Sequence, residues 1–401
     1  MSQKSTDSLP DVVPDVVARR PRVDVADVLR GLAVLGIILL HSIEHFNFYS
    51  FPPADAQPAW LNFLDRAIWD GMFFLVGGKA YAVFALLFGF SFFIQDDNQL
   101  RRGNDFRRRF CWRLFLLFII GNFNACFFTG EILVLYSLVG FVLVLTCRLS
   151  TRALLILSGV CLLQPVALWQ ILRILIDPAC QPMSLADYQY WSDAFVAQSG
   201  GGFTDTLLVN IWKGQITSLA WAWDNGRVFQ TAALFMLGML IGRQQWFAKS
   251  HLSFWARIFA VAIALYFPLS GITAMIPDFV GNHLLASRLT LITGSLQKFC
   301  FMLMLVSAVL WLWYKVPAWT SLLRLIIPYG RMSMTNYVTQ SIIGSMLFYN
   351  WGFGLFRYLG ITASFLAGVA LFIVQYWFCR WWLARFSRGP MEQVWRRATW
   401  I

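Results

Sequence analysis

A histidine with charged neighbours lies at the end of the first apolar stretch of the chain. Arg30 opens this stretch, apolar or glycine residues fill positions 31–40, and His41 follows directly. On a helix, eleven steps of about 100° place Arg30 and His41 within ~20° of each other and ~16 Å apart along the axis. We therefore expect Arg30 at the cytoplasmic interface and His41 near the middle of a membrane.

Glu44 and His45 supply the neighbours that a proton-transfer site needs. They stand three and four residues after His41, so they would share its face of a helix. Histidine has an ordinary pKa that suits proton transfer near neutral pH, and an adjacent carboxylate can fix its tautomer. Ionisable groups at membrane depth are costly and hence usually functional. The pattern predicts His41 as a general base oriented by Glu44; the alternative is a polar side chain that only hydrogen-bonds a neighbouring helix.

The five residues His41-x-x-Glu44-His45 also match the zinc-protease signature in its inverted form. Two imidazoles at this spacing on a helix could hold a metal, with the carboxylate as base. A third ligand is missing, since His251 is expected on the cytoplasmic side and His283 near the outer face. We therefore expect no bound metal, and a membrane zinc hydrolase is the minor alternative.

Further polar side chains interrupt other apolar stretches. Lys79 is expected either to contact an anionic substrate or to form a structural salt bridge, and Arg227 is expected to contact substrate. Gly77-Gly78-Lys79-Ala80 is not a phosphate loop, because Phe73 stands where the first glycine belongs and Ala80 replaces Ser or Thr. Gly89, like Gly71, Gly77 and Gly78, is expected to let helices approach closely.

A second polar cluster opens a later apolar stretch, at residues 329–341. Asn336 and Gln340 are four residues apart and share one stripe of a helix, with Arg331 ~140° around from Asn336. We assign Asn336 and Gln340 to a cavity, as donors to a carbonyl or sugar, and Arg331 to the cytoplasmic rim near Arg30. The alternative is that these groups only hydrogen-bond neighbouring helices.

The composition requires these residues to be positioned by membrane helices. Of the 401 residues, 58% are hydrophobic, 17% aromatic and only 13% charged. A soluble fold of this size needs more charge on its surface. A secreted soluble enzyme, a disordered regulator and a nucleic-acid-binding domain are therefore excluded, despite the formal net charge of +12.

The chain is predicted to be an all-α polytopic membrane protein with about ten transmembrane helices and both termini in the cytoplasm. Each expected span holds roughly 20 apolar residues: 28–47, 67–94, 113–129, 131–147, 152–176, 227–247, 255–276, 287–313, 325–350 and 361–384. Basic residues cluster between alternate spans, as in loops retained in the cytoplasm beside anionic lipid. Residues 1–22 are predicted to be a disordered tail, and residues 23–401 one helical domain. An outer segment lies around 178–226, whose part 203–223 is either an amphipathic helix in the interface or an ordinary aromatic-rich connection.

Six motifs resemble those of the YeiB-like membrane proteins, a family titled domain of unknown function 418. They occur in order along nearly the whole chain, at residues 28–37 (VLRGLAVLGI), 78–89 (GKAYAVFALLFG), 130–136 (GEILVLY), 237–243 (LGMLIGR), 330–341 (GRMSMTNYVTQS) and 389–397 (GPMEQVWRR). That family is similar to the transmembrane acyltransferase superfamily, which includes acyltransferase family 3 and heparan-alpha-glucosaminide N-acetyltransferase. Arg30 and His41 match the spacing of the Arg and His in the first span of family 3 enzymes. Asn124 departs from a usual His, and Glu131 from a usual Asp.

The resemblance implies an enzyme of a bacterial inner membrane that moves an acyl group from cytosolic acyl-CoA to a hydroxyl of a glycan or lipid-linked acceptor at the outer face. Arg30 would meet the phosphates or pantetheine of the cosubstrate, and His45, Lys79, Arg227 and the 329–341 cluster would contact substrates. A homo-oligomer in the lipid is compatible with the sequence. The alternative function is a proton-coupled transporter or flippase in which His41, Glu44, Lys79 and Arg227 line a path.

Overall fold

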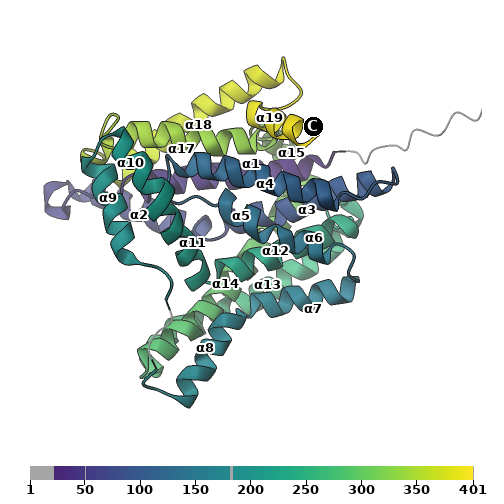
Figure 1. Ribbon diagram of the computed structural model, residues 1–401, viewed down its shortest axis with the longest axis horizontal. Coiled ribbons are helices and arrows are strands. Elements are labelled where there is room, and N and C mark those ends of the chain that lie inside the picture. Colours follow the sequence, from purple (N-terminus) through teal and green to yellow (C-terminus); the bar gives the residue numbers. More distant parts are fainter. Residues whose placement is uncertain (1–21, 50, 181–183, 401) are drawn as a thin grey trace, which may run out of the picture.

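The computed structural model describes residues 22–49, 51–180 and 184–400, so residues 1–21 of the predicted tail lie outside the described part. Within that part every regular element is helical (Figure 1). The first half of the chain forms α1 (Asp24–Ile43), η1 (Ala54–Ala56), α2 (Ala59–Leu75), α3 (Ala80–Leu100), α4 (Arg107–Ala125), α5 (Leu133–Val139), α6 (Phe141–Thr146), α7 (Thr151–Leu162) and α8 (Pro165–Ile176). The second half forms α9 (Tyr188–Gly200), α10 (Phe203–Val209), η2 (Asn210–Gly214), α11 (Gln215–Asp224), α12 (Arg227–Arg243), η3 (Lys249–His251), α13 (Leu252–Phe279), α14 (His283–Lys315), α15 (Pro317–Arg324), α16 (Ile327–Arg331), α17 (Ser333–Phe348), η4 (Leu355–Arg357), α18 (Ile361–Leu383) and α19 (Pro390–Thr399).

Several of these helices are suited to a membrane. Five helical stretches of the described residues are long and apolar enough to cross one, and six if α7 and α8, which meet at 49°, form one broken span. Only 6% of the apolar window of α13 is buried, although its mean hydropathy is 2.0. A surface this apolar is stable beside lipid and not in water. The prediction of a helical membrane protein is confirmed at this level, whereas ten spans and cytoplasmic termini stay predictions.

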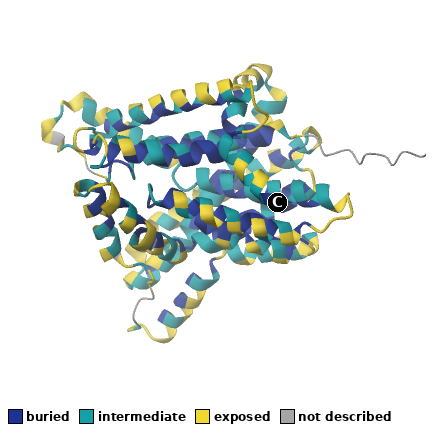
Figure 2. Cartoon of the chain, turned by 45° about the horizontal axis from the view of Figure 1, so that its top comes forward, coloured by how far each residue is buried: buried dark blue, intermediate teal, exposed yellow. Residues whose placement is uncertain are grey.

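α1 is the central helix of the fold, with 72% of its apolar window buried. It packs against α3 on one side and against α16, α17 and α18 on another. Figure 2 shows buried residues concentrated on the inner helices and exposed residues on the outward faces. Most side chains of α1 therefore contact protein.

α3 and α12 pack at the closest distance that helices allow. A Cβ atom at Gly89 would lie 1.9 Å from the carbonyl oxygen of Phe235, and one at Gly238 would lie 1.8 Å from that of Leu86. Glycines permit such backbone contact between helices. The expected close approach is confirmed at Gly89, but it is wrong for Gly71, which has nothing within 4 Å.

The segment expected at the outer face is helical and packs on the bundle. Residues 203–224 form one continuous helical run with a π-helical turn at Asn210–Gly214. The buried side chain of Asn210 accepts a hydrogen bond from Gln198 of α9 (2.7 Å) and donates one to the carbonyl of Cys126 (3.0 Å). The segment is therefore helical, and a buried amide anchors it to the end of α4, whereas its place in the membrane interface stays a prediction.

Candidate active site

His41 lies in the last turn of α1, surrounded by aromatic rings. Its ring centroid is 4.6 Å from that of Phe128, 6.2 Å from Phe46 and 5.3 Å from His45. The side chain is half-buried, and its Nδ1 atom is buried with no hydrogen-bond partner. Because buried polar atoms nearly always have partners, an unpartnered imidazole nitrogen is a candidate for ligand binding. α1 ends two residues later, at Ile43, so His41 lies near one end of the helix, and its depth in a membrane stays a prediction.

Glu44 does not orient His41 in this conformation. α1 ends at Ile43, and the chain turns back through Phe48 and Tyr49, which both have positive φ angles. Glu44 accepts a hydrogen bond from the Tyr49 hydroxyl (2.5 Å), and its other oxygen lies 3.9 Å from Nε2 of His45. Burial, followed by the nearby Glu44 charge, raises the pKa of Tyr49, which keeps the hydroxyl protonated as a donor. The predicted pairing of Glu44 with His41 is thus replaced by pairing with Tyr49 and His45.

Two buried residues that the sequence did not assign to the site lie behind these histidines. Asn124, in the last turn of α4, donates a hydrogen bond from Nδ2 to the carboxylate of Glu131, which also accepts one from the backbone N–H of Leu133. A Cβ atom at Gly130 would lie 3.5 Å from Cδ2 of His45, so this pair borders the histidines. The Oδ1 atom of Asn124 is buried without a partner. The signal was present in the sequence, because a carboxylate flanked by apolar residues marks a functional position.

α17 packs against both α1 and α4, and we call the place where these three helices meet the junction. Gln340 is fully buried, and neither its Nε2 nor its Oε1 has a hydrogen-bond partner. Gly344 lies one helical turn after Gln340 on α17, and a Cβ atom there would lie 2.4 Å from the ring of Phe46. One turn before, the hydroxyl of Tyr337 accepts a hydrogen bond from the backbone N–H of Ile132 (3.4 Å). The unpartnered buried atoms of His41, Asn124 and Gln340 therefore come from the three helices of this junction, where α17 packs against both α1 and α4.

Asn336 differs from Gln340 although both are on α17. Its Nδ2 donates to the carbonyl of Tyr329 (3.0 Å), and its Oδ1 accepts from the thiol of Cys379 (3.3 Å). Both ends of the amide are thus used between α16, α17 and α18. This arrangement favours the structural alternative for Asn336, and Gln340 is the residue of the pair with atoms available for a ligand.

Arg30 and Arg331 lie together at the opposite end of α1. Arg30 donates to Asp27 (2.6 Å) and to Ser91 (2.9 Å). A Cβ atom at Gly330 would lie 1.9 Å from the carbonyl oxygen of Asp27, so α16 crosses α1 there. Arg331 donates to the carbonyl of Ser387 (3.0 Å), and its Nε is buried without a partner. The two guanidinium groups therefore border the same stretch of α1.

Replacing Arg331 with alanine is expected to raise the apparent KM for the acyl donor and to leave turnover at saturation largely unchanged. The reason is that a guanidinium far from the reacting atoms contributes binding that is equal in ground and transition states. Initial rates measured against acyl-CoA concentration test this. Arg324→Ala, an exposed arginine on α15, is the control, and an equal effect of both substitutions would remove Arg331 from the site.

Lys79 and Arg227 are brought together, and Lys298 joins them. A Cβ atom at Gly78 would lie 3.0 Å from Cδ of Lys298 and 3.6 Å from Nη2 of Arg227. Lys79 is the next residue in the chain. No periodicity in the sequence connects these three cations, because α3, α12 and α14 meet only in the folded protein.

No metal centre is formed by the described residues, among which no group of three or more His, Cys, Asp or Glu side chains is placed to hold an ion. The helix needed by the inverted zinc motif ends before Glu44.

Purified protein is expected to carry well below one equivalent of zinc, and chelators are expected to leave its activity unchanged, because His41 and His45 have no third ligand. Metal analysis by plasma mass spectrometry tests this. Stoichiometric zinc that disappears in both His41→Ala and His45→Ala would show a metallohydrolase instead.

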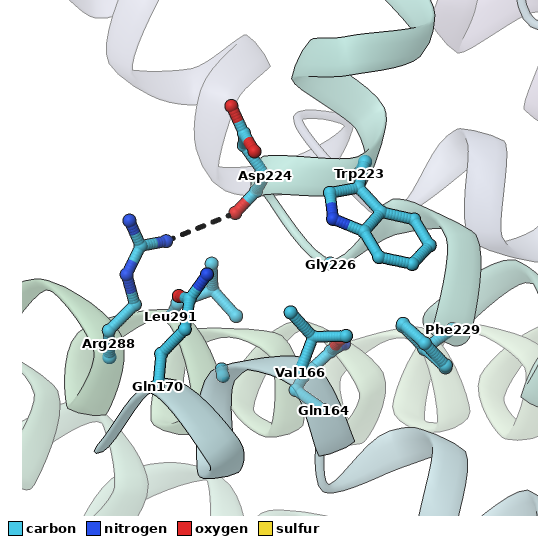
Figure 3. A pocket seen from close by; sticks show the side chains of 10 residues that line it. Gln164, Val166, Gln170, Trp223, Asp224, Gly226, Phe229, Arg288 and Leu291 are labelled. Carbon is cyan, nitrogen blue, oxygen red and sulfur yellow. Dashed lines mark hydrogen bonds between the residues drawn. The ribbon is translucent and has the colours of Figure 1, made fainter. Parts of the chain in front are cut away.

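A separate pocket opens between α8, the α11–α12 connection and α14 (Figure 3). Its empty volume is about 260 Å³, including space open to the solvent. Arg288 spans it and donates to the carbonyl of Asp224 (3.4 Å). None of the site residues predicted from the sequence lines it, but Gly226 does, and Gly226 precedes Arg227.

Comparison with known proteins places the chain among relatives without an assigned activity. Residues 241–401 match the family described as "Protein of unknown function (DUF418)". Over nearly its whole length the chain is similar to "Uncharacterized protein YxaH" of Bacillus subtilis, with 27% identity over 95% of this chain and 94% of the relative. It is also similar to "Uncharacterized protein YeiB" of Escherichia coli, with 25% identity over 93% of this chain and 95% of the relative. The chain is a relative of the YeiB-like proteins.

The resemblance drawn from the six motifs is thereby confirmed, and it extends over nearly the whole length of these bacterial relatives. The part matched by the family description includes α13 to α19 and therefore Arg331, Asn336 and Gln340. His41, Asn124 and Glu131 lie before it, within the part shared with the YeiB-like relatives. No solved structure matches the chain.

Proposed function

We propose that this YeiB-like protein is an acyltransferase of the bacterial cytoplasmic membrane. It would cross the membrane ten times with both termini inside, and would move an acyl group from cytosolic acyl-CoA to a hydroxyl of a glycan or lipid-linked acceptor. The observation that carries the proposal is that His41, Asn124 and Gln340 keep buried polar atoms without partners on α1, α4 and α17, and that α17 packs against both other helices. Leaving such groups without partners in a folded protein costs about 1–3 kcal/mol each, so a bound substrate is the natural occupant.

The ends of α1 suit the two halves of an acyl-CoA. Arg30 and Arg331 lie at one end, where guanidinium forks would bind the phosphates of the nucleotide. His41 lies at the other end, ~16 Å along the helix axis from Arg30. The flexible arm of the cosubstrate would run along α1 and bring its thioester to His41.

His41 would remove the proton from the acceptor hydroxyl as the oxygen attacks the thioester carbonyl. The Nε2 amide of Gln340 would donate to the carbonyl oxygen as negative charge develops there. The C–S bond then breaks, the acyl group stays on the acceptor, and the leaving thiolate takes the proton from His41. Glu44 would act through His45 and Tyr49, which it contacts, to shape the acceptor side of the site.

A second candidate function is proton-coupled transport of an anion, which is favoured by the cluster of Lys79, Arg227 and Lys298. The two functions differ in whether free thiol appears. An acyltransferase in proteoliposomes releases CoA from acyl-CoA when the acceptor is present, whereas a transporter exchanges labelled substrate across the membrane without releasing thiol. Thiol release that depends on protein and acceptor would support acyl transfer, and counterflow without thiol would refute it.

A further inference from the structure

The three cations beside Gly78 form a cluster that we call the cation cluster, consisting of Lys79, Arg227 and Lys298. Gly78 has a φ angle of +72°, and a Cβ atom there would lie 3.0 Å from Cδ of Lys298 and 3.6 Å from Nη2 of Arg227, so both cations lie against this glycine. Arg227 stacks on the ring of Tyr81 at 4.3 Å, and Lys79 donates to the carbonyl of Phe73 at 3.0 Å. The positive charges of Arg227 and Lys298 both act on Lys79.

The cation cluster has no counter-charge in the described part of the protein. None of its three members forms an ion pair there, although Arg22, Arg30, Arg101, Arg107, Arg148 and Lys213 do. One guanidinium nitrogen of Arg227, Nη1, is buried with no hydrogen-bond partner. Like charges in a medium of low dielectric constant repel strongly. An anion bound among the three cations would relieve that repulsion and accept a hydrogen bond from Arg227.

Two helix ends add to the positive potential. Lys79 is the residue directly before α3, and Arg227 is the first residue of α12. The amino ends of helices carry unsatisfied N–H groups and a partial positive charge, which favour phosphate and other anions. A carboxylate carries one negative charge, which is less than the positive charge of three side chains and two helix ends. A phosphate monoester carries about −1.5 to −2 charges at neutral pH and therefore balances more of it.

The cation cluster adjoins the pocket of Figure 3. Gly226 lines the pocket and Arg227 is the next residue. Gln164 at the pocket wall donates to the hydroxyl of Ser295 (3.1 Å), and Gln230 donates to the carbonyl of the same serine (3.4 Å). Gln230 in turn accepts from the hydroxyl of Tyr81, on which Arg227 stacks. A chain of hydrogen bonds therefore links the pocket wall at Gln164 to Tyr81, the ring on which Arg227 stacks.

We propose that Lys79, Arg227 and Lys298 bind the phosphate monoester of a ligand that approaches through the pocket between α8, α12 and α14. Binding at this site does not depend on acyl transfer. The phosphate belongs either to a soluble molecule or to a lipid headgroup, and the two sources share this chemistry.

The test is the thermal unfolding of purified full-length protein at constant ionic strength. Inorganic phosphate is titrated against protein in detergent, and phosphatidylcholine vesicles with or without phosphatidic acid are compared after reconstitution. Lys298→Gln removes one cation, and Lys315→Gln makes the same change at the far end of the same helix. Lys79→Gln is the second variant.

Phosphate or phosphatidic acid is expected to raise the unfolding temperature of the wild type and of Lys315→Gln. Lys298→Gln and Lys79→Gln should weaken that binding roughly 10–100-fold, as expected for loss of a charge-assisted hydrogen bond. Both should be at least as stable as the wild type without phosphate, since repulsion is reduced. Stabilisation by inorganic phosphate identifies a soluble ligand, and stabilisation by phosphatidic acid alone identifies a headgroup. No stabilisation of the wild type by either, or equal loss in Lys315→Gln, would overturn the proposal.

Discussion

Replacing His41 with alanine is expected to lower the rate of thiol release from acyl-CoA by about 10²–10⁴-fold, the usual contribution of a positioned general base. Expression and membrane insertion should be retained, because Nδ1 of His41 has no hydrogen-bond partner and the substitution removes only ring contacts with Phe128, Phe46 and His45. His41→Gln, which keeps most of the volume but cannot serve as base, should show the same loss of rate.

The control for this substitution is His283→Ala, an exposed histidine at the start of α14. Its rate should match that of the wild type. A His41→Ala protein that folds poorly but keeps wild-type specific activity in the folded fraction would show that His41 is structural, and wild-type activity in His41→Gln would lead to the same conclusion.

The largest stability effect is expected for Gly238→Ala. A methyl group at Gly238 would lie 1.8 Å from the carbonyl oxygen of Leu86, a backbone atom that cannot rotate away. α3 and α12 would have to move apart along their whole contact, including the reciprocal contact at Gly89. We expect destabilisation at or above the upper end of the ~1–3 kcal/mol typical of overpacked cores.

Gly271→Ala is the matched control, because Gly271 lies within α13 and has nothing within 4 Å. Alanine is favoured over glycine inside a helix by up to ~1 kcal/mol, so this variant should be as stable as the wild type or slightly more stable. Thermal unfolding in detergent measures both. Equal stability of Gly238→Ala and Gly271→Ala would mean that α3 and α12 do not pack as described.

The helices could be predicted from the sequence because each apolar stretch is long and bounded by charge. What failed was local geometry inside those stretches. The span expected at 152–176 is bent by 49° between α7 and α8, where Pro165 has no backbone N–H and restricts Gln164 before it. α1 was expected to continue past Glu44, but the aromatic residues after Ile43 pack better in a turn than in a helix: the ring of Phe48 lies 4.9 Å from that of Tyr349.

The site was predicted only where its members are close in sequence. Arg30 and His41 share α1, so helix geometry fixes their separation. Asn124 and Glu131 were noticed only as departures from a family pattern, and their hydrogen bond depends on how α4 and α5 meet. Lys298 was not predicted at all, because its closeness to Gly78 and Arg227 depends on the packing of α14 against α3. Tertiary contacts of this kind leave no periodicity in one sequence.

The central claim is that acyl-CoA binds along α1 between Arg30 and His41, and a cryo-electron microscopy structure with a non-hydrolysable acyl-CoA analogue tests it most directly. We predict density for the nucleotide at Arg30 and Arg331, and the acyl carbonyl within hydrogen-bond reach of Gln340 and about 3–3.5 Å from an acceptor hydroxyl position beside His41. An analogue bound elsewhere, or an empty junction of α1, α4 and α17 at saturating analogue, would contradict this assignment.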